Sequence, residues 1–507
     1  MKKIINYIAA VGMIMSAVSC SFTDLEPTDK VGDKEIFSSV TTLEQALTGT
    51  YSKMSMKTTI SVSAVLSDDV YKGGQNGGAG DDSYQWTYSA STGDHNTLWS
   101  SYYSVISMAN RVINGSVGIT PADDSEAKTK NNCIGSALFI RAYTYFDLLR
   151  FFSDYEKNDS YGIPYSKETV VLETLGRNSV AECFAAIKKD LETAIPLLVQ
   201  VTPDDPAYAS QAAAKALLAK VYATHYKSGD AKYARAAQLC KEVLESAAVG
   251  NPQTGADLVA YNKIFDITNE MNKEIIFAAR YLSGNVGLGS PFGNMFAPVN
   301  NGANVIIGTS SGYNTPSDNI ITAYTMRGAT DKRLDVNIAQ KYFNSTTQEW
   351  VTTGNCRYCK KYTNPVSTQY DGESDWPIIR VGDIALLYAE LTNEISGPSA
   401  DNLKYLNMIC ERAGVSTYTL ADLSNRYDFR EAVRNERRLE LAFENQRWFD
   451  MLRWGTAAQT VNNYFKSETF YSEYTYVVND IADWQTFLPI PVSVININPD
   501  IAQNTGY

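Results

Sequence analysis

Residues Phe429 to Gly455 read FREAVRNERRLELAFENQRWFDMLRWG, and in this stretch apolar side chains alternate with charged ones. Glu436, Glu440 and Glu444 recur at four-residue steps, which places them on one face of a helix, with Arg434 and Arg438 on another. Such a row of carboxylates is compatible with acid–base chemistry. The surplus of arginines instead favours a network of ion pairs that locks helices together.

Upstream segments also have helical periodicity. Ser179 to Leu198 places apolar residues at three- and four-residue steps, and Ser179 with Glu182 forms a capping box at its start. The Ala-rich segment Ala212 to His225 is followed by a break at Gly229-Asp230, and Tyr233 to Ala247 then resumes the helical period. This helix–turn–helix run resembles a tetratricopeptide repeat unit.

A second helix pair follows near the C-terminal end. Ile384 to Ile395 forms one apolar face, Gly397-Pro398 the turn, and Leu403 to Ile409 the returning face. Such pairs cannot bury their apolar faces alone, so we expect them to stack. Long irregular stretches, Gly73 to Gly93 and Ser283 to Pro316, separate the helices. The sequence therefore predicts a mostly α fold, with tetratricopeptide-like helix pairs packed against an irregular, loop-rich second half.

Four stretches of the chain together resemble one known family. Residues 436–450 resemble the ER-x-x-E-x-x-F-E-x-x-R-W-x-D stretch of the SusD/RagB family. Three further matches lie in family order: Ile140 to Arg150 (IRAYTYFDLLR), Ile379 to Glu390 (IRVGDIALLYAE), and the ending from Leu488-Pro-Ile-Pro491 through Asn498-Pro499 to Tyr507. Gly382 departs from the family pattern, in which an aromatic residue or alanine is commoner at that position.

The resemblance implies a SusD-like fold and a function. Members of the family are surface lipoproteins of Bacteroidetes that bind glycans at the outer membrane. They act as a lid on a SusC-like, TonB-dependent transporter and take part in nutrient uptake and polysaccharide utilisation, without cutting the sugar. By this resemblance the protein binds a glycan and is not an enzyme. The rings that stack on sugars in the family lie largely on variable loops of the half opposite the repeats.

The N-terminus has the pattern of a bacterial lipoprotein signal peptide. Met1-Lys2-Lys3 is followed by an apolar run, Ile4 to Val18, that is too short to span a membrane, and small residues precede Cys20. This resembles a lipobox, in which the cysteine is acylated. The alternative is an ordinary cleaved signal with a chance cysteine. We expect a lipid anchor on Cys20 in the outer membrane, with the protein facing the cell exterior.

The segments divide the chain as follows. Residues 1–19 form the signal peptide, 20–30 the lipidated N-terminus and tether, and 31–507 a single SusD-like body. Within that body, we expect an N-terminal part over about 31–270 and a C-terminal part over about 271–507.

Composition excludes several functions. The formal charge is −12, or −14 once Lys2 and Lys3 are removed, and this negative charge argues against binding of nucleic acid. Only two histidines occur, which argues against imidazole catalysis and most zinc sites. We expect no cofactor, although a structural calcium ion is compatible with the Asp-rich loops. Whether Cys356 and Cys359 form a disulfide stays open, because a lone C-x-x-C is a weak signal.

Sugar recognition requires flat rings that stack on a pyranose, together with amides and carboxylates that bind hydroxyls. The candidates are loop aromatics outside the family motifs, with Trp86 first because it lies in a Gly-rich loop beside Asp81 and Asp82. The full set is Trp86, Tyr84, Tyr71, Tyr88, Phe292, Phe296, Tyr313 and Trp350, with Asn76 and Asn294 as candidate hydroxyl contacts. We expect the remaining tryptophans to lie in the core: Trp99, Trp376, Trp448, Trp454 and Trp484.

Three alternatives remain. A lipid-anchored glycosidase would use paired carboxylates, and Asp68-Asp69 and Asp81-Asp82 are pairs in sequence, although adjacency does not set the spacing that hydrolysis needs. A helical scaffold would bind proteins through its repeats. A peptide-binding member of the same family would use the same fold for another ligand.

Overall fold

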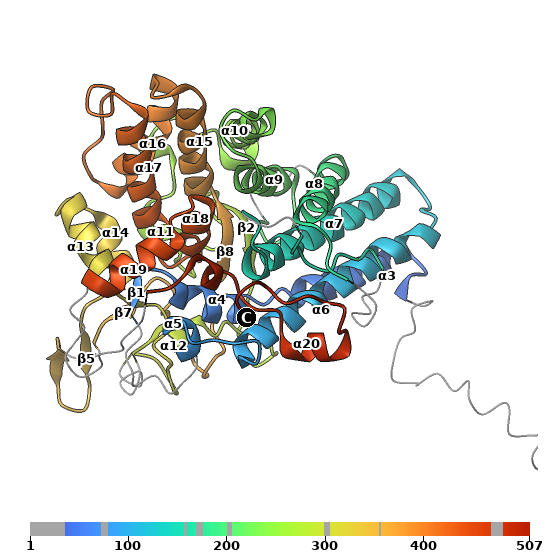
Figure 1. Ribbon diagram of the computed structural model, residues 1–507, viewed down its shortest axis with the longest axis horizontal. Helices are drawn as coiled ribbons and strands as arrows, with labels where there is room; N and C mark the ends of the chain where they lie inside the picture. The colour runs from blue at the N-terminus through green and yellow to red at the C-terminus, as the bar shows by residue number, and fades with distance from the viewer. Residues whose placement is uncertain are drawn as a thin grey trace, which may run out of the picture.

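The computed structural model in Figure 1 describes residues 36–71, 80–156, 160–168, 176–199, 205–298, 305–353, 356–467 and 480–507. The signal peptide, Cys20 and the tether lie outside these ranges. The fold is mostly helical with few, short strands, as the sequence predicted. Within the described ranges, no helix combines the length and hydropathy that a membrane span requires.

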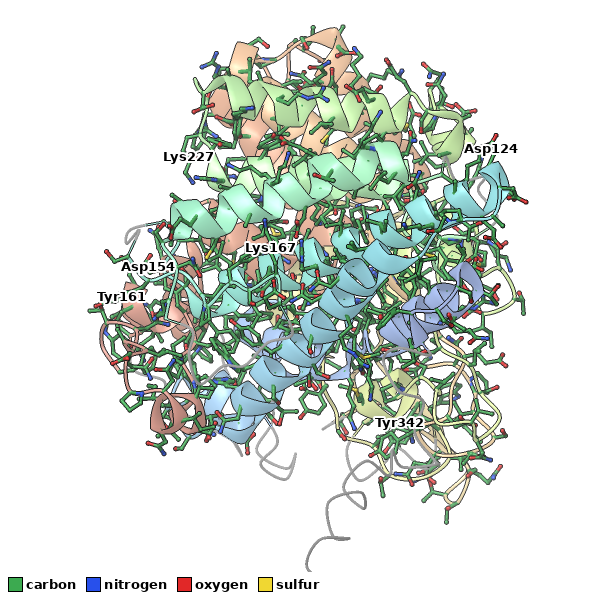
Figure 2. All side chains as sticks on the ribbon, turned by 90° about the vertical axis from the view of Figure 1, so that its right-hand side faces the viewer. Asp124, Asp154, Tyr161, Lys167, Lys227 and Tyr342 are labelled. Atoms are coloured by element: carbon green, nitrogen blue, oxygen red, sulfur yellow. The ribbon has the colours of Figure 1, made fainter. Side chains whose placement is uncertain are left out.

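One half of the molecule is a row of helices, each packed on the next. The helices are α3 (Val40–Ser52), α6 (Gly93–Gly115), α7 (Asp124–Phe152), α8 (Val180–Leu197), α9 (Gln211–His225), α10 (Ala231–Leu244), α15 (Val381–Ser396), α16 (Ala400–Ala413) and α17 (Arg426–Glu440). Helices α3 and α6 pack on α7, then α8, α9, α10 and α15 follow in turn, and α16 and α17 pack on α15. Figure 2 shows α6, α7 and α8 side by side. Both predicted helix pairs, α9–α10 and α15–α16, are present.

The start of α8 confirms the predicted capping box. The Ser179 hydroxyl accepts a hydrogen bond from the Glu182 N–H at 3.1 Å, and the Glu182 carboxylate accepts one from the Ser179 N–H at 2.8 Å. The following helix, α9, is rich in alanine on its buried side, including Ala213, Ala216 and Ala219. Small side chains allow α8 and α10 to approach α9 closely, so the row stays compact.

The other half consists of short elements joined by long loops. Its helices are α4 (Lys57–Ser63), α5 (Asp81–Tyr84), α11 (Tyr261–Ile264), α12 (Phe292–Phe296), α13 (Asp318–Arg327), α14 (Lys332–Asn337), α18 (Arg447–Arg453), α19 (Ala457–Ser467) and α20 (Val492–Ile497). Its strands are β1 (Val70–Tyr71), β2 (Ile275–Ala279), β3 (Thr315–Pro316), β4 (Ile338–Ala339), β5 (Tyr342–Asn344), β6 (Glu349–Val351), β7 (Tyr358–Cys359) and β8 (Trp376–Arg380). They form the antiparallel pairs β1–β3, β2–β8, β4–β7 and β5–β6.

A buried cluster of charges joins the two halves, and we call it the central ion cluster. Five carboxylates meet five cations in it: Glu274, Asp331, Glu436, Glu440 and Glu444 with Arg327, Arg333, Lys361, Arg380 and Arg412. The Arg380 guanidinium lies 2.6 Å from Glu440 Oε1 and 2.6 Å from Glu444 Oε2. Burial raises the pKa of Glu440, but arginines including Arg412 and Arg380 lower it to about 2. The predicted ion-pair network is therefore confirmed.

The helix of the quoted stretch is shorter than predicted. Helix α17 ends at Glu440, and Phe443 and Asn445 have φ of 64° and 63°, so the chain turns before Glu444. Glu444 nevertheless reaches the central ion cluster, where it accepts from Arg380 Nε at 2.6 Å and from Lys361 Nζ at 2.7 Å. The sequence therefore predicted correctly that Glu436, Glu440 and Glu444 form ion pairs together. They do not share one helical face, however, because a turn separates Glu444 from α17.

Two further groups of ion pairs add to the central ion cluster. Asp383, Glu390 and Asp450 pair with Lys220, Arg437 and Arg453 between α9, α15, α17 and α18. Asp68 and Asp69, in the loop before β1, pair with Arg438 and Arg447. Cys356 and Cys359 are free thiols in the structure, so the open question of a disulfide is answered there in the negative.

Candidate functional site

Most of the rings predicted to bind ligand are buried. Seven of the eight are at most 8% exposed: Tyr71, Tyr84, Trp86, Tyr88, Phe292, Phe296 and Tyr313. Asn76 lies outside the described residues. Rings this deeply covered have no free face for a sugar in this arrangement. Among the tryptophans expected in the core, Trp99, Trp376 and Trp448 are buried and Trp454 is half-buried, whereas the prediction for Trp484 is wrong because it is 39% exposed.

Trp86 shows why the loop rings are covered. Its ring centroid lies 5.5 Å from that of Trp448, on the family motif, and 5.9 Å from that of Tyr88. Its backbone has φ of 58°, which turns the loop back onto the body. Burying a ring of this size removes a large apolar area from water, so the loop gains more by folding inward than by presenting the ring. Trp86 is a packing residue in this arrangement.

Trp350 is the exception among the predicted rings, since 57% of it is exposed. It lies on strand β6, opposite Phe343 on β5, in the hairpin at the lower left of Figure 1. The predicted set therefore contains one ring available to a ligand, and that ring stands apart from the others.

A second exposed ring, Tyr370, was not predicted. It lies in the loop before β8, is 40% exposed, and has φ of 61°. The side chain of Asn294, on α12, positions it: Oδ1 of Asn294 accepts from the Tyr370 N–H at 2.8 Å, and Nδ2 donates to the carbonyls of Ile307 and Thr309 at 2.8 and 2.9 Å. All hydrogen-bonding groups of the buried Asn294 amide are thereby used. Asn294 positions two loops rather than contacting sugar hydroxyls itself.

Four polar side chains lie around the Tyr370 ring: Lys57, Thr309, Ser311 and Gln369. We call these residues and Tyr370 the Tyr370 surface. The Tyr370 hydroxyl lies 3.4 Å from Thr309 Oγ1, which also accepts a hydrogen bond from Gln369 Nε2. Hydrogen bonding to Thr309 lowers the pKa of Tyr370, with smaller contributions from Gln369, Ser311 and Lys57. Lys57 Nζ lies 5.8 Å from the ring centroid.

Tyr313, one of the predicted rings, lies against α12. Its N–H donates to the Met295 carbonyl at 2.7 Å, which lays its loop on α12. Burial raises the pKa of Tyr313, and the carboxylates of Asp94 and Asp81 raise it further, together with Tyr370. Asp81 and Asp94 are half-buried. Two carboxylates therefore lie near Tyr313.

The arrangement suits the recognition of a polyhydroxylated ring. An exposed aromatic face can stack on the apolar face of a sugar, while hydroxyl, amide and ammonium groups beside it can bind hydroxyls. Nothing in it resembles a metal centre: over the described ranges, no three His, Cys, Asp or Glu side chains are grouped to hold an ion. The sequence signal that could have identified the Tyr370 surface is the run Asn364 to Ser374, NPVSTQYDGES, in which one aromatic residue lies among turn-forming residues.

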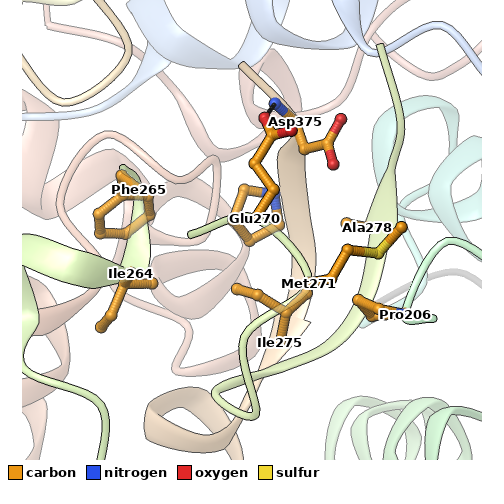
Figure 3. Close-up of a pocket in the computed structure, with 9 residues that line it drawn as sticks. Pro206, Ile264, Phe265, Glu270, Met271, Ile275, Ala278 and Asp375 are labelled. Atoms are coloured by element: carbon orange, nitrogen blue, oxygen red, sulfur yellow. Dashed lines mark hydrogen bonds between the residues drawn. The ribbon is translucent and has the colours of Figure 1, made fainter. Parts of the chain in front are cut away.

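The small cavity in Figure 3 does not suit a sugar. Its volume is about 20 Å³, which holds about one water molecule. Pro206, Ile264, Phe265 and Met271 line it with two carboxyls, Glu270 and Asp375. The Asp375 N–H donates to Glu270 Oε1 at 3.2 Å. Burial, and next the Asp375 carboxylate, raise the pKa of Glu270 to about 7, and burial raises the pKa of Asp375 to about 6.

Glu270→Gln is expected to stabilise the protein at pH 8 and to have no effect at pH 4. A carboxyl whose pKa is raised from 4.5 to about 7 by folding contributes full stability below 4.5, and that contribution is lost as the pH rises to 7. Because Glu270 is half-exposed, solvent screening reduces the gain at pH 8 to about 1 kcal/mol. Urea unfolding at both pH values measures it. Glu349→Gln, on the exposed face of β6, is the control and should change neither value. A gain that is larger at pH 4 would refute this assignment.

The architecture defines a class: a helical-repeat protein whose loop-rich half carries exposed rings. Residues 289–507 match the sequence profile of the SusD family, and residues 21–223 match a SusD-like profile described as starch-binding associating with outer membrane. The chain belongs to the SusD/RagB family. The sequence-based identification is thus confirmed.

Individual relatives agree with this assignment. SusD-like protein P2 of Formosa agariphila is 24% identical over 472 residues, covering 87% of this chain and 89% of the relative. A SusD-like protein of Bacteroides ovatus is 25% identical over 501 residues, covering 90% and 83%.

Solved structures share the fold. A laminarin binding SusD-like protein superposes with a TM-score of 0.72 at 21% identity, covering 93% of this chain and 100% of that one. Surface glycan-binding protein A from Bacteroides thetaiotaomicron, in complex with laminarihexaose, gives a TM-score of 0.72 at 19% identity, covering 92% and 100%.

Proposed function

We propose that this protein binds an oligosaccharide or polysaccharide at the Tyr370 surface without cleaving it. The observation that carries the proposal is an exposed tyrosine ring, 40% accessible, bordered by Thr309 and Gln369 on loops of a SusD-family fold. Similar solved structures described as laminarin binding and as a laminarihexaose complex support a glycan as the ligand class. The proposal requires no cofactor.

The same proposal includes the location and the partner. A lipid on Cys20 would hold the chain at the outer face of the outer membrane, next to a SusC-like TonB-dependent transporter that receives the glycan. The lipobox-like sequence before Cys20 and a matched family described as associating with the outer membrane support this. Labelling of intact cells with a membrane-impermeant reagent should reach the protein. Labelling only after cell lysis would exclude an outward-facing position.

The ion pairs around Asp68 and Asp69 argue against the glycosidase alternative, in which these two carboxylates would be catalytic. Asp68 accepts two hydrogen bonds from Arg447, at 2.7 and 3.0 Å, and Asp69 accepts one from Arg438 at 2.6 Å. Burial raises the pKa of Asp68, but Arg438 and Arg447 lower it to about 2, so Asp68 cannot act as a general acid near neutral pH. Burial raises the pKa of Asp69, whose carboxylate Arg438 holds in an ion pair. The carboxylates of the central ion cluster are likewise paired with arginines or Lys361. These pairings favour binding over hydrolysis.

The experiment is a retention screen of the soluble chain, residues 21–507, on immobilised plant, host and microbial polysaccharides. Retention on at least one polysaccharide, with no shorter sugars released, is the expected result. Release of shorter sugars would support the glycosidase alternative. Tight binding of peptides, with retention on no polysaccharide, would instead identify a peptide-binding member of the family.

A further inference from the structure

The hairpin formed by β5 and β6, residues 341–353, carries a second exposed aromatic face, and we call it the aromatic hairpin. Phe343 and Trp350 are paired across its two strands and are 40% and 57% exposed. Their ring centroids lie 5.6 Å apart at an angle of 66°. Lys341 Nζ lies 4.7 Å from the centroid of Trp350. Alternation along the strand places Tyr342, which is 4% exposed, on the opposite, inward face.

The outward rings are not needed to attach the hairpin to the body. Tyr342 is buried at its base, and the strands that flank it, β4 and β7, pair with each other through Ile338 and Cys359. The Cys356 thiol also donates to the Gln340 carbonyl at 3.1 Å. A cross-strand aromatic pair adds only about 0.2–1 kcal/mol to a hairpin. Leaving a tryptophan and a phenylalanine in water side by side therefore indicates a surface that meets a ligand.

The other exposed side chains of the hairpin indicate what that ligand is. Exposed hydroxyls and an amide come from Ser345, Thr346, Thr347, Gln348, Thr352 and Thr353, and exposed charges from Lys341 and Glu349. The one aliphatic side chain over residues 341–353, Val351, is half-buried, as is Asn344. A protein-binding site would need a wider apolar centre than two rings. An anionic lipid surface is disfavoured by the net charge of −12. Two rings within a border of hydroxyls and amides match a pyranose chain.

The aromatic hairpin and the Tyr370 surface belong to different loops of the same half. The loop that carries Thr309 runs directly into β3, which packs against β7 at the base of the hairpin. In Figure 1 the hairpin lies at the lower left and α12, whose Asn294 bonds to the Tyr370 backbone, at the bottom, and Figure 2 shows Tyr342 in the lower part. A polysaccharide long enough to span these two loops would meet both surfaces, whereas a short oligosaccharide would fill one.

We propose that the aromatic hairpin is a second glycan-binding platform, which contacts a separate segment of the polysaccharide held at the Tyr370 surface. This inference rests on the proposed function. Binding at one surface raises the effective concentration of the polymer at the other, so two weak contacts give strong retention of long chains. Affinity for short oligosaccharides depends on the Tyr370 surface alone.

The test compares Trp350→Ala with the wild-type soluble chain on a retained polysaccharide and on its short oligosaccharide. Trp350→Ala is expected to weaken polysaccharide binding about tenfold and to leave oligosaccharide binding unchanged. Trp350→Phe, which keeps a ring, should retain most of the affinity and guards against loss of the hairpin fold. Trp484→Ala, at an exposed tryptophan near the C-terminus, is the matched control and should bind both ligands normally.

Three outcomes are informative against the proposal. Unchanged polysaccharide binding by Trp350→Ala would refute the second platform and leave the proposed function intact. An equal loss of polysaccharide and oligosaccharide binding would make the hairpin part of one continuous site, which also refutes a separate platform. If the wild-type chain binds no glycan, the proposed function itself fails.

Discussion

Replacing Arg380 with methionine is expected to lower the free energy of unfolding by about 3–5 kcal/mol. Arg380 is 1% exposed and bonds to Glu440 and Glu444, and its Nη1 lies 3.2 Å from Glu274. Methionine keeps the unbranched apolar stem of arginine and lacks the guanidinium group, so the substitution removes the charge and its donors. The remaining carboxylates would then be buried with one cation too few. Equilibrium unfolding in urea or guanidinium, followed by circular dichroism, measures the change.

A matched control separates burial from ion pairing as such. Arg235 pairs with Glu242, but its side chain is 38% exposed, so Arg235→Met should cost less than about 1 kcal/mol. The double variant Arg380→Met/Glu440→Gln restores the balance of charge in the central ion cluster and should lose less stability than the sum of the two single variants. Equal losses for Arg380→Met and Arg235→Met, or strict additivity in the double variant, would contradict this account of the cluster.

The Tyr370→Ala variant is expected to weaken glycan binding by about tenfold or more, which corresponds to at least about 1.4 kcal/mol of binding free energy. The ring is the exposed aromatic face of the Tyr370 surface, and its removal leaves Thr309 and Gln369 without the platform beside them. Tyr370→Phe keeps the ring and removes only the hydroxyl, so it should bind much more strongly than Tyr370→Ala. Isothermal titration with a short oligosaccharide measures both.

Tyr427→Ala is the matched control for this prediction. Tyr427 is 65% exposed, more than Tyr370, but it lies on α17 in the helical half. Its replacement should leave glycan binding unchanged. Wild-type affinity in Tyr370→Ala, or an equal loss in Tyr427→Ala, would place the ligand elsewhere.

The sequence predicted the helical half well because its signals are local. The apolar steps and the capping box at Ser179 define α8 through contacts within a few residues. The charged stretch around Glu440 predicted an ion cluster because carboxylates and arginines packed together in a core must pair. It did not predict the turn after α17, since phenylalanine, unlike asparagine, rarely adopts the positive φ that Phe443 has.

The ligand surface was harder to predict because exposure is decided by distant partners. Trp86 is covered by Trp448, which lies far along the chain, and no local pattern indicates that contact. Tyr370 is presented outward because Asn294, on α12, holds its backbone. Trp350, predicted as a loop aromatic, is exposed because it lies on the outward face of a short hairpin that the sequence reasoning did not predict. Long loops in a compact protein therefore bury most of their rings, and only tertiary contacts reveal which stay outside.

The most direct measurement is a crystal structure of the soluble chain, residues 21–507, with an oligosaccharide that the retention screen identifies. We predict a sugar ring stacked on Tyr370, with hydroxyls bonded to Thr309 or Gln369. A sugar bound only against the helical row formed by α7 to α10, with the Tyr370 surface empty, would contradict it.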